Sequence, residues 1–237
     1  MKQLFTKMLP RFVAMATTVT MGMAALTLST MATAADGDVK AGQSKAAMCI
    51  GCHGIVGYQN VFPEVYKVPM ISGQSAEYIA AALKAYKKGD RKHPTMRGIA
   101  GTLNDEDIAD LSAFYAASGT GEAAPEAQTA ATADVAALLA KGGCVACHGV
   151  NYSKPLDPSY PKIAGQHADY LYSALRAYKI TGNKVAGRNN AIMAGVVSQF
   201  DNAELKAISK YLSTLDGELV VKPQSRLRYA KLIKKCR

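Results

Sequence analysis

Two short runs of cysteine and histidine are the residues of this sequence best suited to chemistry. Both runs read C-x-x-C-H, and they consist of Cys49, Cys52 and His53 and of Cys144, Cys147 and His148. This pattern is the attachment signature of c-type haem. Two thiols on one helical turn can each form a thioether with a porphyrin vinyl group, and the next residue can then bind the iron through its imidazole. The sequence therefore predicts two covalently bound haem c groups in one chain.

Three other uses of such cysteines agree less well with the pattern. Disulfides form in exported proteins, but they would not require the histidines. A thioredoxin-like pair needs a βαβ setting, and no strand pattern lies near these cysteines. A zinc site built from two C-x-x-C pairs usually separates them by about 15–20 residues. Here the two pairs begin 95 residues apart.

The second protein ligand of each iron decides what the iron does. An open position binds small molecules, whereas methionine opposite histidine favours Fe(II) and raises the reduction potential. Met96 and Met193 lie 43 and 45 residues after their histidines, at equivalent places of a repeat, so we predict them as iron ligands rather than core filler. His93 is a rival ligand, otherwise a surface histidine, because Asn190 stands at its equivalent position. His167 is expected at the surface or as a helix cap.

The chain is an internal duplication. Residues 69–79 align with residues 161–171 at an offset of 92, and both segments read Pro-x-x-x-Gly-Gln followed by a tyrosine four residues later. The stretch between the halves, residues 119–133, is rich in alanine, glycine and threonine and is typical of a linker. This divides the chain into a first domain at residues 36–118 and a second at residues 134–216.

Both halves have helical patterns and no convincing strand, so the expected fold class is all-α. We expect helices at 41–48 and 135–141, leading into the two runs, and a helix capped by Ser75. Asn104, followed by three acidic residues, should cap another helix, and Asp201 or Asn202 its counterpart. Domains of this size have thin cores, and this chain has five Phe and no Trp. The porphyrin should supply the missing apolar mass of each domain.

The N-terminal segment has the pattern of a secretory signal peptide. Lys2, Lys7 and Arg11 precede an apolar stretch, and Ala32 to Ala34 offer a cleavage site, so residues 1–34 should be removed. An uncleaved membrane anchor is the alternative, because the apolar stretch approaches spanning length. The mature protein should then be exported and soluble.

The net charge of +10 is concentrated at the two ends of the chain. Residues 1–34 carry +3 and residues 217–237 carry +6, which leaves +1 for the body and gives no indication of nucleic acid binding. The basic C-terminal tail, residues 217–237, is either a solvated extension or a docking element for an acidic partner or an anionic membrane surface. Cys236 is an incidental thiol or a site of disulfide dimerisation.

These motifs make the chain similar to the dihaem cytochrome c4 family, which consists of tandem class I c-type cytochrome domains, over about residues 36–215. The resemblance implies an all-α fold in which two cytochrome c-like domains each wrap around one haem, with Pro69 and Pro161 on the histidine side. It also implies haems that face each other with neighbouring propionates. Members of the family carry electrons in the periplasm from quinol-oxidising complexes to terminal oxidases. The insert-like segment 61–67 and the tail do not match the family.

The expected function is therefore an electron carrier with no catalytic residues, and its partners are redox proteins. Two alternatives remain open. The chain could be the cytochrome subunit of a larger dehydrogenase, such as a sulfide-oxidising flavocytochrome. A dihaem peroxidase is the other enzyme class, but the sequence supplies no obvious distal acid–base pair.

Overall fold

The computed structural model describes residues 37–223, which belong to one compact unit. The predicted signal peptide, Cys236 and the possible tail helix at 225–235 lie outside the described residues. Between residues 37 and 223, no helix combines the length and the apolar character that crossing a membrane requires.

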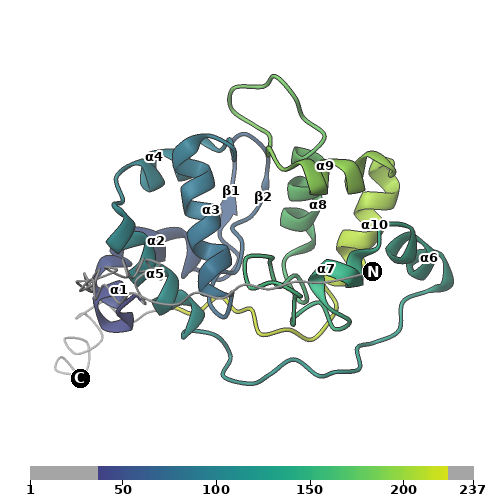
Figure 1. The fold of residues 1–237 in the computed structure, drawn as a ribbon, viewed down its shortest axis with the longest axis horizontal. Coiled ribbons are helices and arrows are strands. Elements are labelled where there is room, and N and C mark those ends of the chain that lie inside the picture. The colour runs from purple at the N-terminus through teal and green to yellow at the C-terminus, as the bar shows by residue number, and fades with distance from the viewer. Residues whose placement is uncertain (1–36, 224–237) are drawn as a thin grey trace, which may run out of the picture. The chain divides into compact units, whose positions relative to one another are not determined.

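Helices build both halves in the same order (Figure 1). In the first half they are α1 (Val39–Lys45), α2 (Ala47–His53), α3 (Ala76–Lys88), α4 (Pro94–Gly101) and α5 (Asp105–Ala116). In the second half they are α6 (Ala133–Lys141), α7 (Cys144–His148), α8 (Ala168–Ala177), α9 (Ala191–Ser198) and α10 (Asn202–Leu212). Within the described residues, the strands are β1 (Gln59–Asn60) and β2 (Tyr66–Lys67), which pair antiparallel with Gln59 opposite Lys67. The all-α prediction is confirmed.

Each half has its own apolar core, and the last helix of the half is its centre. In the first half α5 packs against α1 and α3, and in the second half α10 packs against α6 and α8. The buried face of α5 consists of Ile108, Leu111, Phe114 and Tyr115, as the sequence predicts. In each half the core contacts predicted haem-binding residues, so it positions them directly.

The predicted caps of the two last helices are confirmed. Asn104 Oδ1 accepts from the backbone N–H of Asp107 at 2.8 Å, and Asp201 forms the same capping box with Glu204. Ser75 differs from the prediction. It occupies the position before α3, but its hydroxyl donates to the carbonyl of Pro158 at 2.5 Å, in the other half, instead of capping its own helix.

The helix expected at 41–48 is divided into α1 and α2. The break falls at Ala46, which is fully buried against the first core, where its ψ of 2° departs from helical geometry. The equivalent break in the second half lies at Gly142 and Gly143, between α6 and α7. In both halves the short second helix, which carries the C-x-x-C-H run, can therefore have a different direction from the helix before it.

A close approach of α1 to α5 occurs at Gly42, where a Cβ atom would lie 2.0 Å from the carbonyl oxygen of Asp110. We expect Gly42→Ala to lower the free energy of unfolding by about 1–3 kcal/mol or more, because the helices must separate. Thermal denaturation would measure this loss. Gly98→Ala in α4 is the matched control, since no atom lies within 4 Å there, and its stability should stay equal or rise slightly. Equal melting temperatures for wild type and Gly42→Ala would contradict the close approach.

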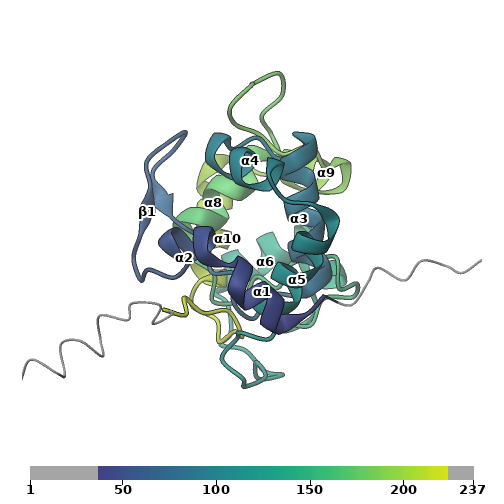
Figure 2. The same ribbon diagram turned by 90° about the vertical axis from the view of Figure 1, so that its left-hand side faces the viewer.

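The segment that departs from the family pattern connects the two halves. The β1–β2 hairpin projects beside the helices of the first half (Figure 2). The backbone N–H of Lys67 donates to Asp169 Oδ2 at 3.0 Å, and Ser173 Oγ donates to Glu64 Oε2 at 2.9 Å. Arg176 adds an ion pair with Glu64 at 3.3 Å. The insert thus fastens the first half to α8.

The first residues of the predicted tail also pack against the first half. Val220 forms an isolated bridge with Ser72, and its N–H donates to the Ser72 carbonyl at 3.1 Å. A Cβ atom at Gly73 would lie 2.2 Å from the carbonyl oxygen of Glu218, so only glycine allows this approach. Residues 217–223 therefore run from the second half across the first.

Candidate haem-binding site

One cavity of about 660 Å³ contains residues from both halves. All eight predicted site residues line it, namely Cys49, Cys52, His53, Met96, Cys144, Cys147, His148 and Met193. The four cysteines are free thiols, as covalent attachment of a haem requires. Cofactor sites have volumes of this order and are mostly apolar, as this one is.

Both motif histidines are held in the same orientation. His53 Nδ1 lies 2.9 Å from the Pro69 carbonyl oxygen, and His148 Nδ1 lies 2.9 Å from that of Pro161. Because a carbonyl only accepts, each Nδ1 must carry the proton, and each Nε2 keeps its lone pair for a metal. Burial lowers the pKa of both imidazoles, which keeps them neutral. This geometry leaves each Nε2 available as a metal ligand.

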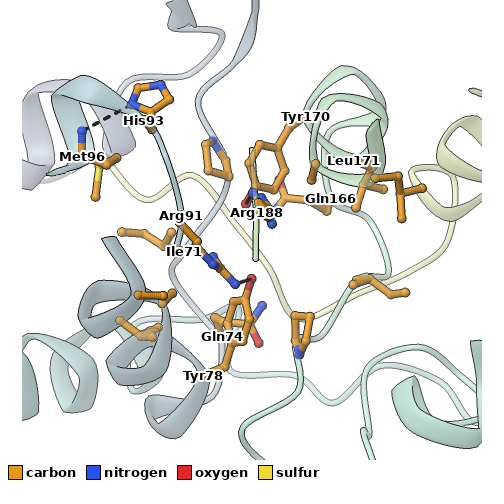
Figure 3. Close-up of a pocket in the computed structure, with 18 of the residues that line it drawn as sticks. Ile71, Gln74, Tyr78, Arg91, His93, Met96, Gln166, Tyr170, Leu171 and Arg188 are labelled. Carbon is orange, nitrogen blue, oxygen red and sulfur yellow. Dashed lines mark hydrogen bonds between the residues drawn. The ribbon is translucent and has the colours of Figure 1, made fainter. Parts of the chain in front are cut away.

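The two methionines lie at the starts of equivalent helices, α4 and α9. The Met96 N–H donates to His93 Nδ1 at 3.3 Å (Figure 3), and the Met193 N–H donates to Asn190 Oδ1 at 2.9 Å. His93 and Asn190 are thus equivalent helix caps. His93 is half-buried, with its ring edge against Tyr66 at a centroid distance of 6.4 Å. Its Nδ1 lone pair accepts the backbone N–H, which disfavours His93 as the rival iron ligand.

His167 is not among the residues that line this cavity, although it directly follows Gln166, which is. It occupies the position before α8, but its side chain makes no capping hydrogen bond. The ring is half-buried, so His167 is neither the helix cap nor the fully exposed surface residue that the sequence suggested.

Two arginines that the sequence reasoning missed lie in the middle of the cavity. Arg91 Nη2 donates to the Tyr78 hydroxyl at 3.0 Å, and Arg188 Nη2 donates to the Tyr170 hydroxyl at 3.0 Å (Figure 3). The backbones of Arg91 and Arg188 form an antiparallel bridge, with the neighbouring Lys92 N–H donating to the carbonyl of the residue before Arg188 at 2.9 Å. The pair therefore joins the two halves through equivalent positions of the repeat.

These arginines have no carboxylate partner among residues 37–223. Burial alone would lower the pKa of both guanidinium groups, but their tyrosine neighbours raise it, so both stay charged. Charges inside a protein are normally paired. The cavity therefore fits a ligand that carries anionic groups, and the propionates of a haem are such groups.

The repeat contains the signal that could have identified these residues. Arg91 and Arg188 are 97 positions apart, the same offset as Met96 and Met193. Tyr78 and its equivalent lie in the segments that align at an offset of 92. The alignment of the repeat thus shows an arginine and a tyrosine at equivalent positions of both halves. That the two arginines lie beside each other could be learned only from the structure.

Comparison with known proteins agrees with this geometry. The sequence pattern of the cytochrome c family matches residues 39–116 and 132–216. Cytochrome c4 of Azotobacter vinelandii is 30% identical over 198 residues, which cover 76% of this chain and 90% of the relative. The chain belongs to the dihaem cytochrome c4 family. As a member of the cytochrome c4 family, it carries two covalently bound haem c groups and transfers electrons with redox partner proteins.

Two further relatives, one with a solved structure, are similar to the chain over most of its length. The structure of reduced recombinant cytochrome c4 from Pseudomonas stutzeri superposes with a TM-score of 0.56 at 28% identity, over 76% of this chain and 100% of that one. A thiosulfate dehydrogenase electron acceptor from Stutzerimonas stutzeri is 31% identical over 206 residues, which cover 82% of this chain and 93% of the relative. The chain is thus similar over most of its length both to cytochromes c4 and to a protein named as an electron acceptor of thiosulfate dehydrogenase.

Proposed function

We propose that the chain is a periplasmic carrier that passes single electrons from a quinol-oxidising complex to a terminal oxidase. The observation that supports this most is that each half brings one C-x-x-C-H run and one methionine to the same cavity. Each haem, when bound, supplies an iron that alternates between Fe(II) and Fe(III). With histidine and methionine as its two ligands, an iron exchanges electrons rather than binding a substrate.

The proposed roles of the chain's residues follow the repeat. Cys49 and Cys52 form the thioethers of the first haem, and Cys144 and Cys147 those of the second. His53 with Met96, and His148 with Met193, would bind the irons of the first and second haem. We place the two domains at residues 36–118 and 134–216, joined by residues 119–133. The division into two halves is supported by the two stretches that the family pattern matches, residues 39–116 and 132–216.

Arg91 and Arg188 are proposed to hold the haem propionates, together with the hydroxyls of Tyr78 and Tyr170. Their uncompensated charges face the cavity, and arginine forms strong, directional hydrogen bonds with carboxylates. Because their backbones are paired, both arginines would hold the propionate edges of the two groups at the boundary between the halves. Two haems held at one boundary would favour rapid sharing of an electron between the halves.

An enzymatic role has less support from the cavity. A peroxidase needs an open iron with an acid–base group above it. The histidine beside the predicted ligand Met96 is His93, and its Nδ1 accepts the N–H of that methionine. It is thus a helix cap and not a free base.

The second candidate function is the electron acceptor of a dehydrogenase. The thiosulfate dehydrogenase electron acceptors among the relatives favour this class specifically. The cytochrome subunit of a sulfide-oxidising flavocytochrome belongs to the same class.

Electron donors distinguish the candidates. The oxidised protein would be mixed with one of three donor systems: a quinol-oxidising complex with quinol, thiosulfate dehydrogenase with thiosulfate, or a flavocytochrome with sulfide. The absorbance of the haems would then be followed over time. We expect rapid reduction of both haems by the first mixture and reoxidation by a terminal oxidase. Rapid reduction by one dehydrogenase alone would replace the respiratory proposal with the second candidate.

The basic tail is proposed to assist peripheral membrane association. Residues 224–237 contain six Lys or Arg and no Asp or Glu, and clustered cations attract anionic lipid surfaces. Because residues 217–223 pack against the first half, a truncation at residue 223 removes the charge and preserves the described fold. At low salt the full chain should sediment with anionic vesicles and the truncated chain should not. Equal sedimentation of the two would overturn this role.

A further inference from the structure

Two buried glutamines each reach from their own half into the other. Gln166 Oε1 accepts from the Met70 N–H at 3.1 Å, and its Nε2 donates to the Met70 carbonyl at 2.9 Å. Gln74 makes the same pair of bonds to the N–H and carbonyl of Lys162, both at 2.9 Å. Each glutamine is only 4% exposed. Both side-chain amides lie in the middle of the cavity (Figure 3).

The peptide groups that the glutamines contact are those that accept from the motif histidines. The peptide between Pro69 and Met70 accepts from His53 Nδ1 through its oxygen at 2.9 Å and donates to Gln166 through its N–H. The peptide between Pro161 and Lys162 connects His148 with Gln74 in the same way. Each motif histidine is thus joined, through one peptide group, to a glutamine of the opposite half.

Hydrogen bonds in such a series reinforce one another. When the N–H of a peptide donates, its carbonyl oxygen becomes a better acceptor. A stronger bond from Nδ1–H then gives the imidazole more anionic character, which increases its basicity as a ligand. A more basic ligand favours Fe(III) and lowers the reduction potential.

We propose that Gln166 tunes the potential of the first haem and Gln74 that of the second, so that each half adjusts the iron of the other. Both act through the motif histidines and are positioning residues, not ligands. The inference rests on the proposed axial roles of His53 and His148. Its consequence is a carrier in which the contact between the halves, not either half alone, sets the two potentials.

The backbone before each glutamine is built for this reach. Gly73 and Gly165 have φ values of +89° and +73°, which residues with a side chain rarely adopt. A Cβ atom at Gly73 would also lie 2.2 Å from the Glu218 carbonyl oxygen, and one at Gly165 would lie 3.1 Å from that of Leu215. The repeated Gly-Gln pair therefore directs each amide away from its own half.

The test requires each haem to be observed separately. Met193→His should lower the potential of the second haem, so that the upper wave of a redox titration reports the first haem. Met96→His should lower the potential of the first haem, so that the upper wave reports the second haem. Into each background Gln166→Leu or Gln74→Leu is introduced, and each glutamine serves as the matched control of the other. Circular dichroism confirms that the variants fold.

We expect a crossed pattern. With Met193→His, the change Gln166→Leu should raise the Fe(II)/Fe(III) ratio of the upper wave up to about tenfold at fixed potential, which is about 59 mV for one electron. Gln74→Leu should leave that wave in place. With Met96→His the two glutamines exchange roles. The Nδ1–H proton resonance of His53 in the reduced protein should also move when Gln166 is replaced, which a purely structural contact would not require.

Three outcomes would overturn the proposal: no shift, equal shifts of both waves by either glutamine, or a shift confined to the haem of the mutated half. If a double variant with Gln166→Leu fails to fold, Gln166→Asn shortens the side chain by one methylene and keeps the amide, and the same pattern is expected. Failure of the proposed axial ligands is separable, because the histidine backgrounds would then show no lowered wave at all. Failure of the proposed respiratory role is separable too, because it would appear in the reduction by electron donors and not in these potentials.

Discussion

Replacing Cys144 and Cys147 together with serine should reduce the haem content of the chain from two groups to one. Serine hydroxyls do not form thioethers with the porphyrin vinyl groups, so the second haem has no covalent attachment. Intact-chain mass spectrometry should show the loss of one haem mass, and the absorbance per chain should fall by about half. Replacing both Cys49 and Cys52 should have the same result in the first half.

The second half should also lose structure in this variant. Leu171, Val197 and Phe200 belong to the second core and also line the cavity, so without the porphyrin they would face water. Far-ultraviolet circular dichroism should therefore show a loss of helix. Cys236→Ser is the matched control, because this cysteine lies outside both C-x-x-C-H runs, and it should retain both haems. Two covalent haems in the Cys144 and Cys147 variant would contradict the attachment proposed here.

Met96→His and Met193→His should each lower the potential of one haem by on the order of 0.2 V. Axial ligands set haem potentials over a range of about 0.8 V, and exchanging a thioether for an imidazole removes a ligand that favours Fe(II). A spectroelectrochemical titration should show one wave displaced and the other nearly unchanged. The methionine-to-iron charge-transfer absorption should fall by about half in either variant.

Met48→Leu is the control for these two variants. Met48 is 56% exposed and has no methionine at the equivalent place in the second half. We expect both waves to keep their positions in Met48→Leu. If Met96→His left both potentials unchanged, His93 would become the candidate ligand despite its capping bond to the same helix.

Features carried by neighbouring residues could be predicted from the sequence. The two C-x-x-C-H runs, the capping boxes at Asn104 and Asp201 and the buried face of α5 depend on residues within a few positions of one another. The break at Ala46 was not predicted because residues 41–48 contain three alanines and no proline, so nothing local marks the end of a helix there. The core of the first half, not local preference, decides that break.

Contacts between the halves could not be predicted in the same way. Met70 and Gln166 are 96 residues apart, and Ser75 and Pro158 are 83 residues apart. Alignment of the repeat shows that both halves contain the same residues, but not that each residue bonds to the opposite copy. Ser75 illustrates the difference, since its sequence position is that of a cap and its hydroxyl contacts the other half.

The visible spectrum of the reduced mature protein, with and without carbon monoxide, is the most direct test of the proposed ligation of both irons. We expect two haem c groups per chain and no spectral change on adding carbon monoxide, because Met96 and Met193 close both irons. A shift of either haem by carbon monoxide would contradict it, since that iron would then have an open or weakly held position and an enzymatic role would have to be considered.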